Sequence, residues 1–177
     1  KALMGLDILA TIGTDTALAQ IQAIARKNKY KPIIARADEM LTAIAEAREL
    51  TGEQFEDRLV PTLGLADDGT LVLDFGQRRF IGGVDESLKP RLYDETGAVL
   101  KDLPKPGKDD DKTLAKESSE QWTEFKTELK PVASLQLIRL ENTMIEARRW
   151  SGDEFKRLVA NQPLLQKPAR SLVWGLF

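Results

Sequence analysis

Residues 71–84 read Leu71-Val72-Leu73-Asp74-Phe75-Gly76-Gln77-Arg78-Arg79-Phe80-Ile81-Gly82-Gly83-Val84, and this stretch decides the fold class. Leu71, Leu73 and Phe75 occupy every second position, and another apolar segment follows the turn at Gly76. A period of two residues is typical of a strand with one buried face, and a glycine turn between two such runs indicates a hairpin. The stretch therefore predicts two antiparallel strands.

The strand pattern extends on both sides of this hairpin, over residues 63–103. Apolar segments at 88–93 and 98–100 are separated by Asp-rich or Gly-containing turns at 85–87 and 94–97. Short strands at this spacing predict an antiparallel meander of three or four strands. Pro90 cannot donate a backbone hydrogen bond, so we expect its strand to lie at an edge or to be irregular.

Residues 1–62 show a helical period instead. Thr14 or Asp15 can cap one helix, Lys31-Pro32 separates it from the next, and Thr51-Gly52-Glu53-Gln54 is a capping box before a short helix. Apolar residues recur at intervals of three and four: Leu18, Ile21, Ile24, Ala25, Ile33, Ala37, Met40, Leu41, Ile44 and Ala45. These features predict a helical hairpin of the kind that stacks in helical-repeat proteins, with neighbouring units missing.

The remaining chain predicts an exposed loop at 104–112 and a helical segment at 113–177 that ends in a truncated strand. Leu114, Trp122, Phe125 and Leu129 form the apolar stripe of a long helix, and Pro131 must kink this helix or start a new one. Ser151-Gly152-Asp153-Glu154 is a second capping box. The whole pattern predicts an α+β fold: an N-terminal repeat-like hairpin, a small antiparallel meander, and a long kinked helix with short helices. The sequence pattern is interrupted at both ends of the chain. We therefore interpret the chain as one compact fragment of a longer polypeptide.

Composition excludes several kinds of chemistry. The chain has 177 residues, a net charge of −2, no cysteine and no histidine. A thiol nucleophile, a thiolate metal site and a histidine base are therefore ruled out. The near-neutral charge argues against a basic nucleic-acid coat, and no apolar run is long enough to span a bilayer. We predict no catalytic residue, no metal site and no cofactor.

Three short motifs favour structural explanations over chemical ones. Gly152-Asp153-Glu154-Phe155 matches a loop of cyclic-dinucleotide cyclases, but here it follows a serine cap and opens a helix. Asp109, Asp110 and Asp111 lack the alternating spacing of a calcium loop and indicate a solvated loop. Gly82-Gly83 lies within a strand, which favours a bulge or tight packing over phosphate binding.

A basic segment provides the candidate binding residues. Residues 139–170 contain seven basic and four acidic side chains. Arg148, Arg149, Lys156 and Arg157 are the candidate contacts to nucleic-acid phosphates. The alternative, which we favour, is a solvated helix face with acidic partners: Glu141, Glu146, Asp153 and Glu154.

Four strings together resemble a known family. They are Asp57-Arg58-Leu59-Val60-Pro61-Thr62-Leu63-Gly64-Leu65, Leu73-Asp74-Phe75-Gly76-Gln77-Arg78-Arg79-Phe80, Lys101-Asp102-Leu103-Pro104-Lys105-Pro106-Gly107-Lys108-Asp109-Asp110 and Arg170-Ser171-Leu172-Val173-Trp174-Gly175. Their order is similar to the uncharacterised C-terminal domain of MolR-like bacterial proteins, which are named as molybdate metabolism regulators. The resemblance implies a large cytoplasmic protein with helical repeats and often a WGR domain. It implies no catalytic residue.

Three hypotheses for function follow. The first is a non-enzymatic scaffold or interaction module of a larger bacterial regulatory protein, which contacts a protein partner or other domains of the same chain. The second is nucleic-acid binding through the basic face at 139–170. The third is part of an enzyme whose site is completed by other segments. The oligomeric state is open.

Overall fold

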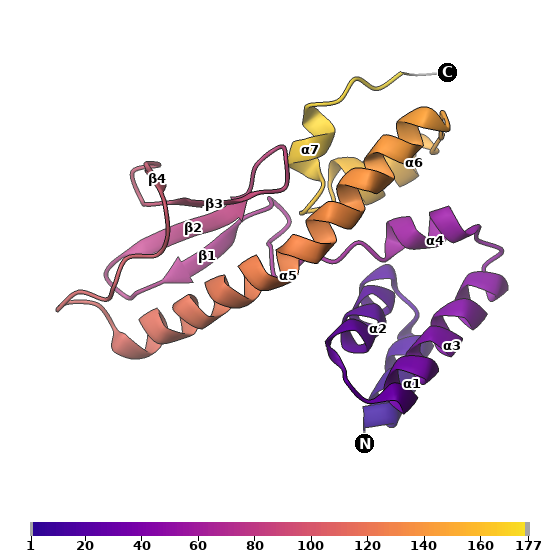
Figure 1. Ribbon diagram of the computed structural model, residues 1–177, viewed down its shortest axis with the longest axis horizontal. Coiled ribbons are helices and arrows are strands. Elements are labelled where there is room, and N and C mark those ends of the chain that lie inside the picture. The colour runs from indigo at the N-terminus through magenta and orange to yellow at the C-terminus, as the bar shows by residue number, and fades with distance from the viewer. Residues whose placement is uncertain (1, 176–177) are drawn as a thin grey trace. The chain divides into compact units, whose positions relative to one another are not determined.

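A computed structural model describes residues 2–175 of the chain. The chain divides into two compact units, Lys1–Pro61 and Thr62–Phe177. The first unit contains helices alone, and the second contains a four-stranded sheet, a long helix and short C-terminal helices (Figure 1). This combination confirms the predicted α+β class.

The first unit consists of α1 (Ala2–Ile12), α2 (Asp15–Lys27), α3 (Lys31–Ala47) and α4 (Gly52–Arg58). Thr14 caps α2, because its hydroxyl accepts a hydrogen bond from the Ala17 N–H at 3.2 Å. At α4 the predicted capping box is complete: the Thr51 hydroxyl accepts from the Gln54 N–H, and the Gln54 side chain accepts from the Thr51 N–H. The predicted hairpin is α2 and α3, and α1 packs against both.

The predicted inner faces of α2 and α3 form most of the core of this unit. Half-buried residues such as Ile24, Ile33 and Ile44 pack around it. The buried core residues are Leu6, Leu18, Ile21, Ala37, Met40, Leu41 and Leu59. Burial of this apolar surface is the main stabilising contribution within the unit.

The second unit begins with the meander. It contains β1 (Leu71–Asp74), β2 (Arg79–Val84), β3 (Pro90–Tyr93) and β4 (Val99–Leu100), in the order β1-β2-β3-β4 with antiparallel pairing throughout. Asp85 and Asp94 fix the two later turns, because the carboxylate of each accepts backbone N–H groups from its own turn.

Pro90 differs from the expectation that its strand lies at an edge or is irregular. Strand β3 lies between β2 and β4, and Pro90 is its first residue, opposite Val84 of β2. Strand β4 has only two residues, which pair with Leu92 and Tyr93. The proline is tolerated because the β4 ladder does not extend as far as Pro90.

Helix α5 (Lys112–Ile145) covers one face of this sheet and contacts β1 (Figure 1). Its buried positions recur at intervals of three and four, which is the spacing of one helical face. They are Ala115, Ser118, Trp122, Phe125, Leu129, Val132 and Gln136. The opposing sheet face supplies buried residues from β1, β2 and β3: Leu71, Leu73, Phe80, Gly82, Val84 and Leu92.

Helix α5 differs from the sequence-based expectations at several positions. Leu114 is exposed, because Ala115, one residue further along the helix, takes the inward position. Of the two alternatives for Pro131, the start of a new helix is excluded, because the same helix continues for another fourteen residues to Ile145. Leu135 and Ile138 are also exposed, whereas the neighbouring Gln136 is buried.

The loop before α5 is less solvated than its composition indicates. Asp110 is buried and forms an ion pair with Arg78, whose guanidinium lies 5.5 Å from the centre of the Phe80 ring. The same carboxylate accepts the Gly107 N–H at 2.6 Å. Asp111 caps α5 by accepting the N–H groups of Thr113 and Leu114. These contacts tie the 104–111 loop to the first hairpin.

Short helical elements complete the second unit. They are α6 (Gly152–Phe155), the π-helical turn η1 (Lys156–Ala160) and α7 (Gln166–Arg170). Ser151 caps α6 through the Glu154 N–H. Residues 171–175 form a turn and irregular backbone, so the strand expected there is not present; its last two positions, 176 and 177, lie outside the described residues.

Candidate interaction surfaces

The sheet face opposite α5 carries a continuous apolar row. Val72 is the Cα partner of Ile81, Ile81 of Tyr93, and Tyr93 of Val99, so one residue from each strand lies in the same line. Val72 is 52% exposed and Val99 is 62% exposed, while Ile81 and Tyr93 are half-buried. At a strand spacing of about 4.8 Å, the row is about 14 Å long. We call these four residues the outer row.

Charged groups border the outer row at both ends of the strands. On one side, Arg79 forms an ion pair with Asp74 at 3.4 Å, and its N–H donates to the Glu95 carboxylate at 2.7 Å. On the other side, Arg91 forms an ion pair with Asp85 at 2.9 Å. An apolar centre within a polar rim is the usual anatomy of a protein–protein interface.

The Asp85 carboxylate is held in its charged form. Burial opposes ionisation, but the N–H groups of Lys89 and Ser87 and the Arg91 guanidinium outweigh it and lower the pKa of Asp85. The rim is therefore charged and internally paired at neutral pH. A partner of the outer row would meet little net charge there.

The four candidate nucleic-acid contacts occupy two different environments. Arg148 and Arg149 follow the end of α5, where the Arg148 guanidinium lies 5.0 Å from the centre of the Trp150 ring. Lys156 and Arg157 are the first two residues of η1. The structure brings Lys156 and Arg157 together in one pocket, whose described lining includes neither Arg148 nor Arg149.

That pocket has a volume of about 470 Å³ and mixed charge. Its lining residues come from the turn before β1, from α6 and η1, and from α7: Asp67, Asp153, Lys156, Arg157, Asn161 and Gln166. Two carboxylates therefore face the same space as two cations. We call this the η1 pocket.

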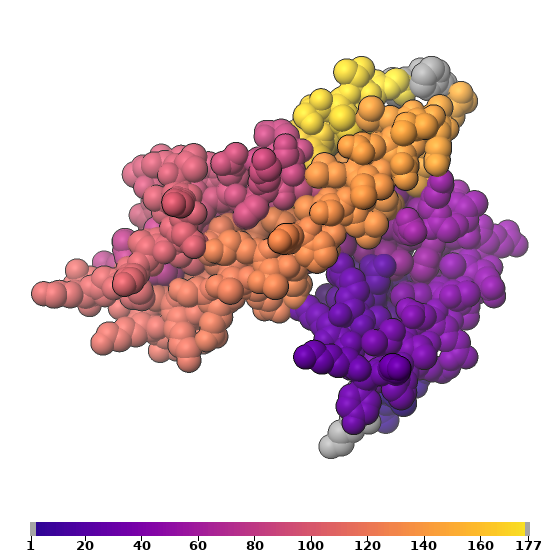
Figure 2. Space-filling view, in the orientation of Figure 1, coloured from indigo at the N-terminus to yellow at the C-terminus, as the bar shows by residue number. Residues whose placement is uncertain are grey.

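An aromatic cluster lies beside η1. Trp174 meets the Phe155 ring edge-on at 4.7 Å and the Trp150 ring at 6.0 Å. Its indole N–H donates to the Ala169 carbonyl at 2.8 Å. The C-terminal residues, yellow in Figure 2, are thereby packed against the segment that follows α5.

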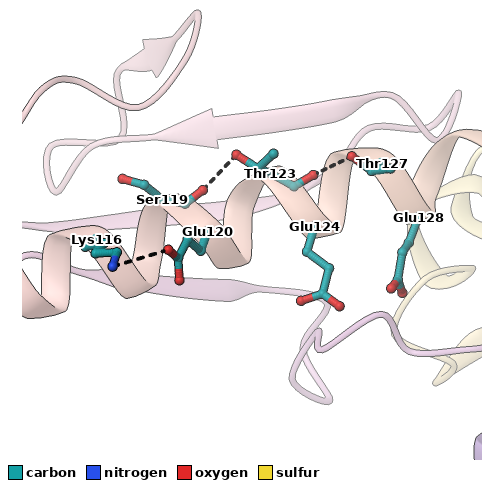
Figure 3. A pocket seen from close by; sticks show the side chains of 7 residues that line it. All are labelled: Lys116, Ser119, Glu120, Thr123, Glu124, Thr127 and Glu128. Carbon is teal, nitrogen blue, oxygen red and sulfur yellow. Dashed lines mark hydrogen bonds and ion pairs between the residues drawn. The ribbon is translucent and has the colours of Figure 1, made fainter. Parts of the chain in front are cut away.

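A further groove, of about 550 Å³, follows α5 itself (Figure 3). Its described lining residues all belong to this one helix: Lys116, Ser119, Glu120, Thr123, Glu124, Thr127 and Glu128. Thr123 and Thr127 donate their hydroxyls to carbonyls one turn earlier, each at 2.8 Å, and Lys116 lies 3.9 Å from Glu120. These groups follow one helix face and do not converge from several elements on a common point.

Two further properties bear on function. Between residues 2 and 175, no three Asp or Glu side chains are grouped as metal ligands would be. Within the same range, no helix has the length and apolar character needed to cross a bilayer.

The fold and these surfaces define a mixed α+β segment with an exposed apolar sheet face. Residues 97–177 match a family described as a domain of unknown function, DUF4132. The chain is 37% identical over all 177 residues to the uncharacterized protein YehI of Escherichia coli (strain K12). It spans about 15% of the length of that relative. No solved structure matches the chain.

The outer row was not predicted from the sequence, although its residues are visible in the alternation of the strands. Val72 and Ile81 alternate with the inward-facing residues of β1 and β2, and both are apolar where a solvated face usually carries polar side chains. The pairing register, which places four such residues in one line, is visible only in the folded sheet.

Proposed function

We propose that this chain is a non-enzymatic interaction module of a larger bacterial regulatory protein, and that the outer row binds a helix from elsewhere in the same polypeptide. The observation that carries the proposal is the row of Val72, Ile81, Tyr93 and Val99, exposed on the sheet face that α5 does not cover. A sheet with one helix-covered face and one apolar open face is completed by a second helical layer.

The relative's length supports an occupant from the same polypeptide. The aligned chain accounts for only 15% of that protein, so most of the relative lies outside the aligned segment. The proposal also includes three properties that the resemblance to MolR-like proteins implies. They are a regulatory role, a cytoplasmic location and an association with a WGR domain.

Because the chain contains no cysteine, a single introduced cysteine can report whether the outer row is accessible to a labelling reagent. Val99→Cys places one thiol in the outer row, and Ser134→Cys places one at an exposed position of α5, away from the outer row, as the matched control. Each variant is prepared as the 177-residue chain and within the full-length protein, and maleimide labelling of its peptide is followed by mass spectrometry. We expect position 99 to react at least about tenfold more slowly in the full-length protein, and position 134 to react equally in both.

Equal labelling of position 99 in both proteins would overturn the proposal. Slower labelling of both positions would also contradict it, because that result indicates general shielding and not contact with the outer row.

Nucleic-acid binding is the second candidate. The observation in its favour is that η1 brings Lys156 and Arg157 into one pocket. Asp67 and Asp153 line the same pocket and would repel phosphates, which makes this candidate the weaker one. Binding of fluorescent single- and double-stranded DNA and RNA at low and moderate salt tests it. Binding that falls with salt and weakens in Lys156→Ala/Arg157→Ala would support it, and no binding at low salt would end it.

A further inference from the structure

We propose that the η1 pocket binds a small zwitterion, an amino acid or short peptide that carries both an ammonium and a carboxylate group. The pocket has a volume of about 470 Å³, which lies within the range of small-molecule sites. It is formed within the second unit by three separate parts of the chain: the turn at Asp67, the α6–η1 segment and α7. This inference is independent of the outer row.

The pocket is lined by two acidic and two basic side chains. In the part of the chain that the structure describes, no ion pair joins an acidic side chain of the pocket to a basic one. Among the described residues, no ion pair within 4 Å joins the Asp67 carboxylate, the Asp153 carboxylate or the Lys156 ammonium to a partner. On a regular helix, Asp153 and Lys156 are three residues apart and close enough to pair. Here the backbone changes from α-helix to π-helix between them.

The lining residue Gln166 supplies a polar atom for a ligand. Gln166 is 7% exposed, and its Nε2 donates to the Asp67 carbonyl at 3.3 Å and the Pro163 carbonyl at 3.4 Å. No described residue donates to its Oε1. Gly69 makes room for this side chain, since a Cβ there would lie 2.5 Å from Nε2. Because no buried side-chain acceptor among the described residues lacks a partner, this oxygen is reached from solvent, and beside two carboxylates it suits a ligand ammonium.

The same arrangement selects against other ligands. A polyanion would bring its phosphates towards Asp67 and Asp153, and a simple cation would approach Lys156 and Arg157. A zwitterion can place its carboxylate near Lys156 and its ammonium near the two aspartates and Gln166. The π-helical turn supports a functional role, because such turns occur frequently at functional sites.

Ligand-observed NMR with the 177-residue chain tests the proposal. The probes are the free L-amino acids and diglycine at about 10 mM, where even weak binding is visible. N-acetylglycine and glycinamide, which each lack one of the two charges, are the ligand controls. We expect saturable binding of at least one zwitterion and about tenfold weaker binding of its singly charged analogue. Tighter binding of diglycine than of glycine would indicate a peptide ligand. Tighter binding of glycine would indicate a free amino acid.

Two substitutions localise the binding. Lys156→Gln and Asp153→Asn should each weaken it about tenfold, while Lys116→Gln and Glu120→Gln, which make the same charge changes on α5, should leave it unchanged. Circular dichroism confirms that each variant is folded. The proposal is overturned by no zwitterion binding at this concentration, by binding that the pocket variants do not affect, or by equal binding of inorganic phosphate.

Discussion

The indole of Trp122 lies directly against the backbone of Gly82. A Cβ built on Gly82 would lie 2.8 Å from Cζ3 of Trp122 and 3.5 Å from Cβ of Leu71. The absence of a side chain at position 82 therefore lets α5 approach the centre of β2. The Trp122 N–H donates to the Asp102 carboxylate at 2.9 Å, which fixes the ring in this position.

Gly82→Ala should destabilise the second unit by about 1–3 kcal/mol, because the added methyl overlaps a buried indole. All three tryptophans of the chain lie in this unit, so urea unfolding followed by tryptophan fluorescence reports its stability. Gly152→Ala is the matched control, since no atom lies within 4 Å of a Cβ at that position. A wild-type urea midpoint for Gly82→Ala would show that the indole is free to move.

Asp110→Asn should make stability less dependent on pH. The hydrogen bond from Arg78, followed by that from the Gly107 N–H, lowers the pKa of Asp110 in the folded chain. A carboxyl with a lowered native pKa stabilises the fold above its unfolded pKa, and that stabilisation is lost as pH falls through the native pKa.

The urea midpoint of Asp110→Asn should therefore lie below that of the wild type at pH 7, and the two should converge in acid, below the usual aspartate pKa of about 4. Asp109→Asn, at the exposed neighbouring position, is the matched control and should change stability at pH 7 by less than about 0.5 kcal/mol. A constant difference for Asp110→Asn between pH 7 and pH 3 would contradict the assigned ion pair with Arg78.

Pro131→Ala should stabilise the second unit by about 1–3 kcal/mol, because alanine restores the N–H that proline lacks within a helix. Pro131 is exposed, so no packing is lost. The neighbouring substitution Lys130→Ala, also at an exposed position, should change stability by less than about 0.5 kcal/mol. A destabilised Pro131→Ala variant would show that the helix needs the geometry that proline imposes.

Local signals explain which parts of the fold could be predicted. Thr14, Thr51 and Ser151 act within one helical turn, and the strand alternation from Leu71 depends on neighbouring residues alone. The sequence therefore predicted the elements and the meander. The inward position of Ala115 in place of Leu114 depends on how α5 is rotated against the sheet, which no local pattern specifies.

Long-range pairing explains what the sequence did not show about the candidate sites. Asp110 resembled a solvated loop residue because its partner, Arg78, is 32 residues away in the chain. The η1 pocket joins Asp67 to Gln166, which are 99 residues apart. The basic residues at 156 and 157 were visible in the sequence, but the opposing carboxylate of Asp67 became apparent only in the folded unit.

Trp174 should anchor the C-terminal segment to α6 and α7. Trp174→Ala removes the edge-on contact with Phe155 and the hydrogen bond to Ala169, so we expect a loss of about 1–2 kcal/mol in stability and a weaker near-ultraviolet circular dichroism signal. Trp174→Phe, which keeps an aromatic ring but not the N–H, should have an intermediate effect. Val173→Ala, at a fully exposed neighbour, should match the wild type. Equal stability of Trp174→Ala and Val173→Ala would show that the aromatic cluster does not hold this segment.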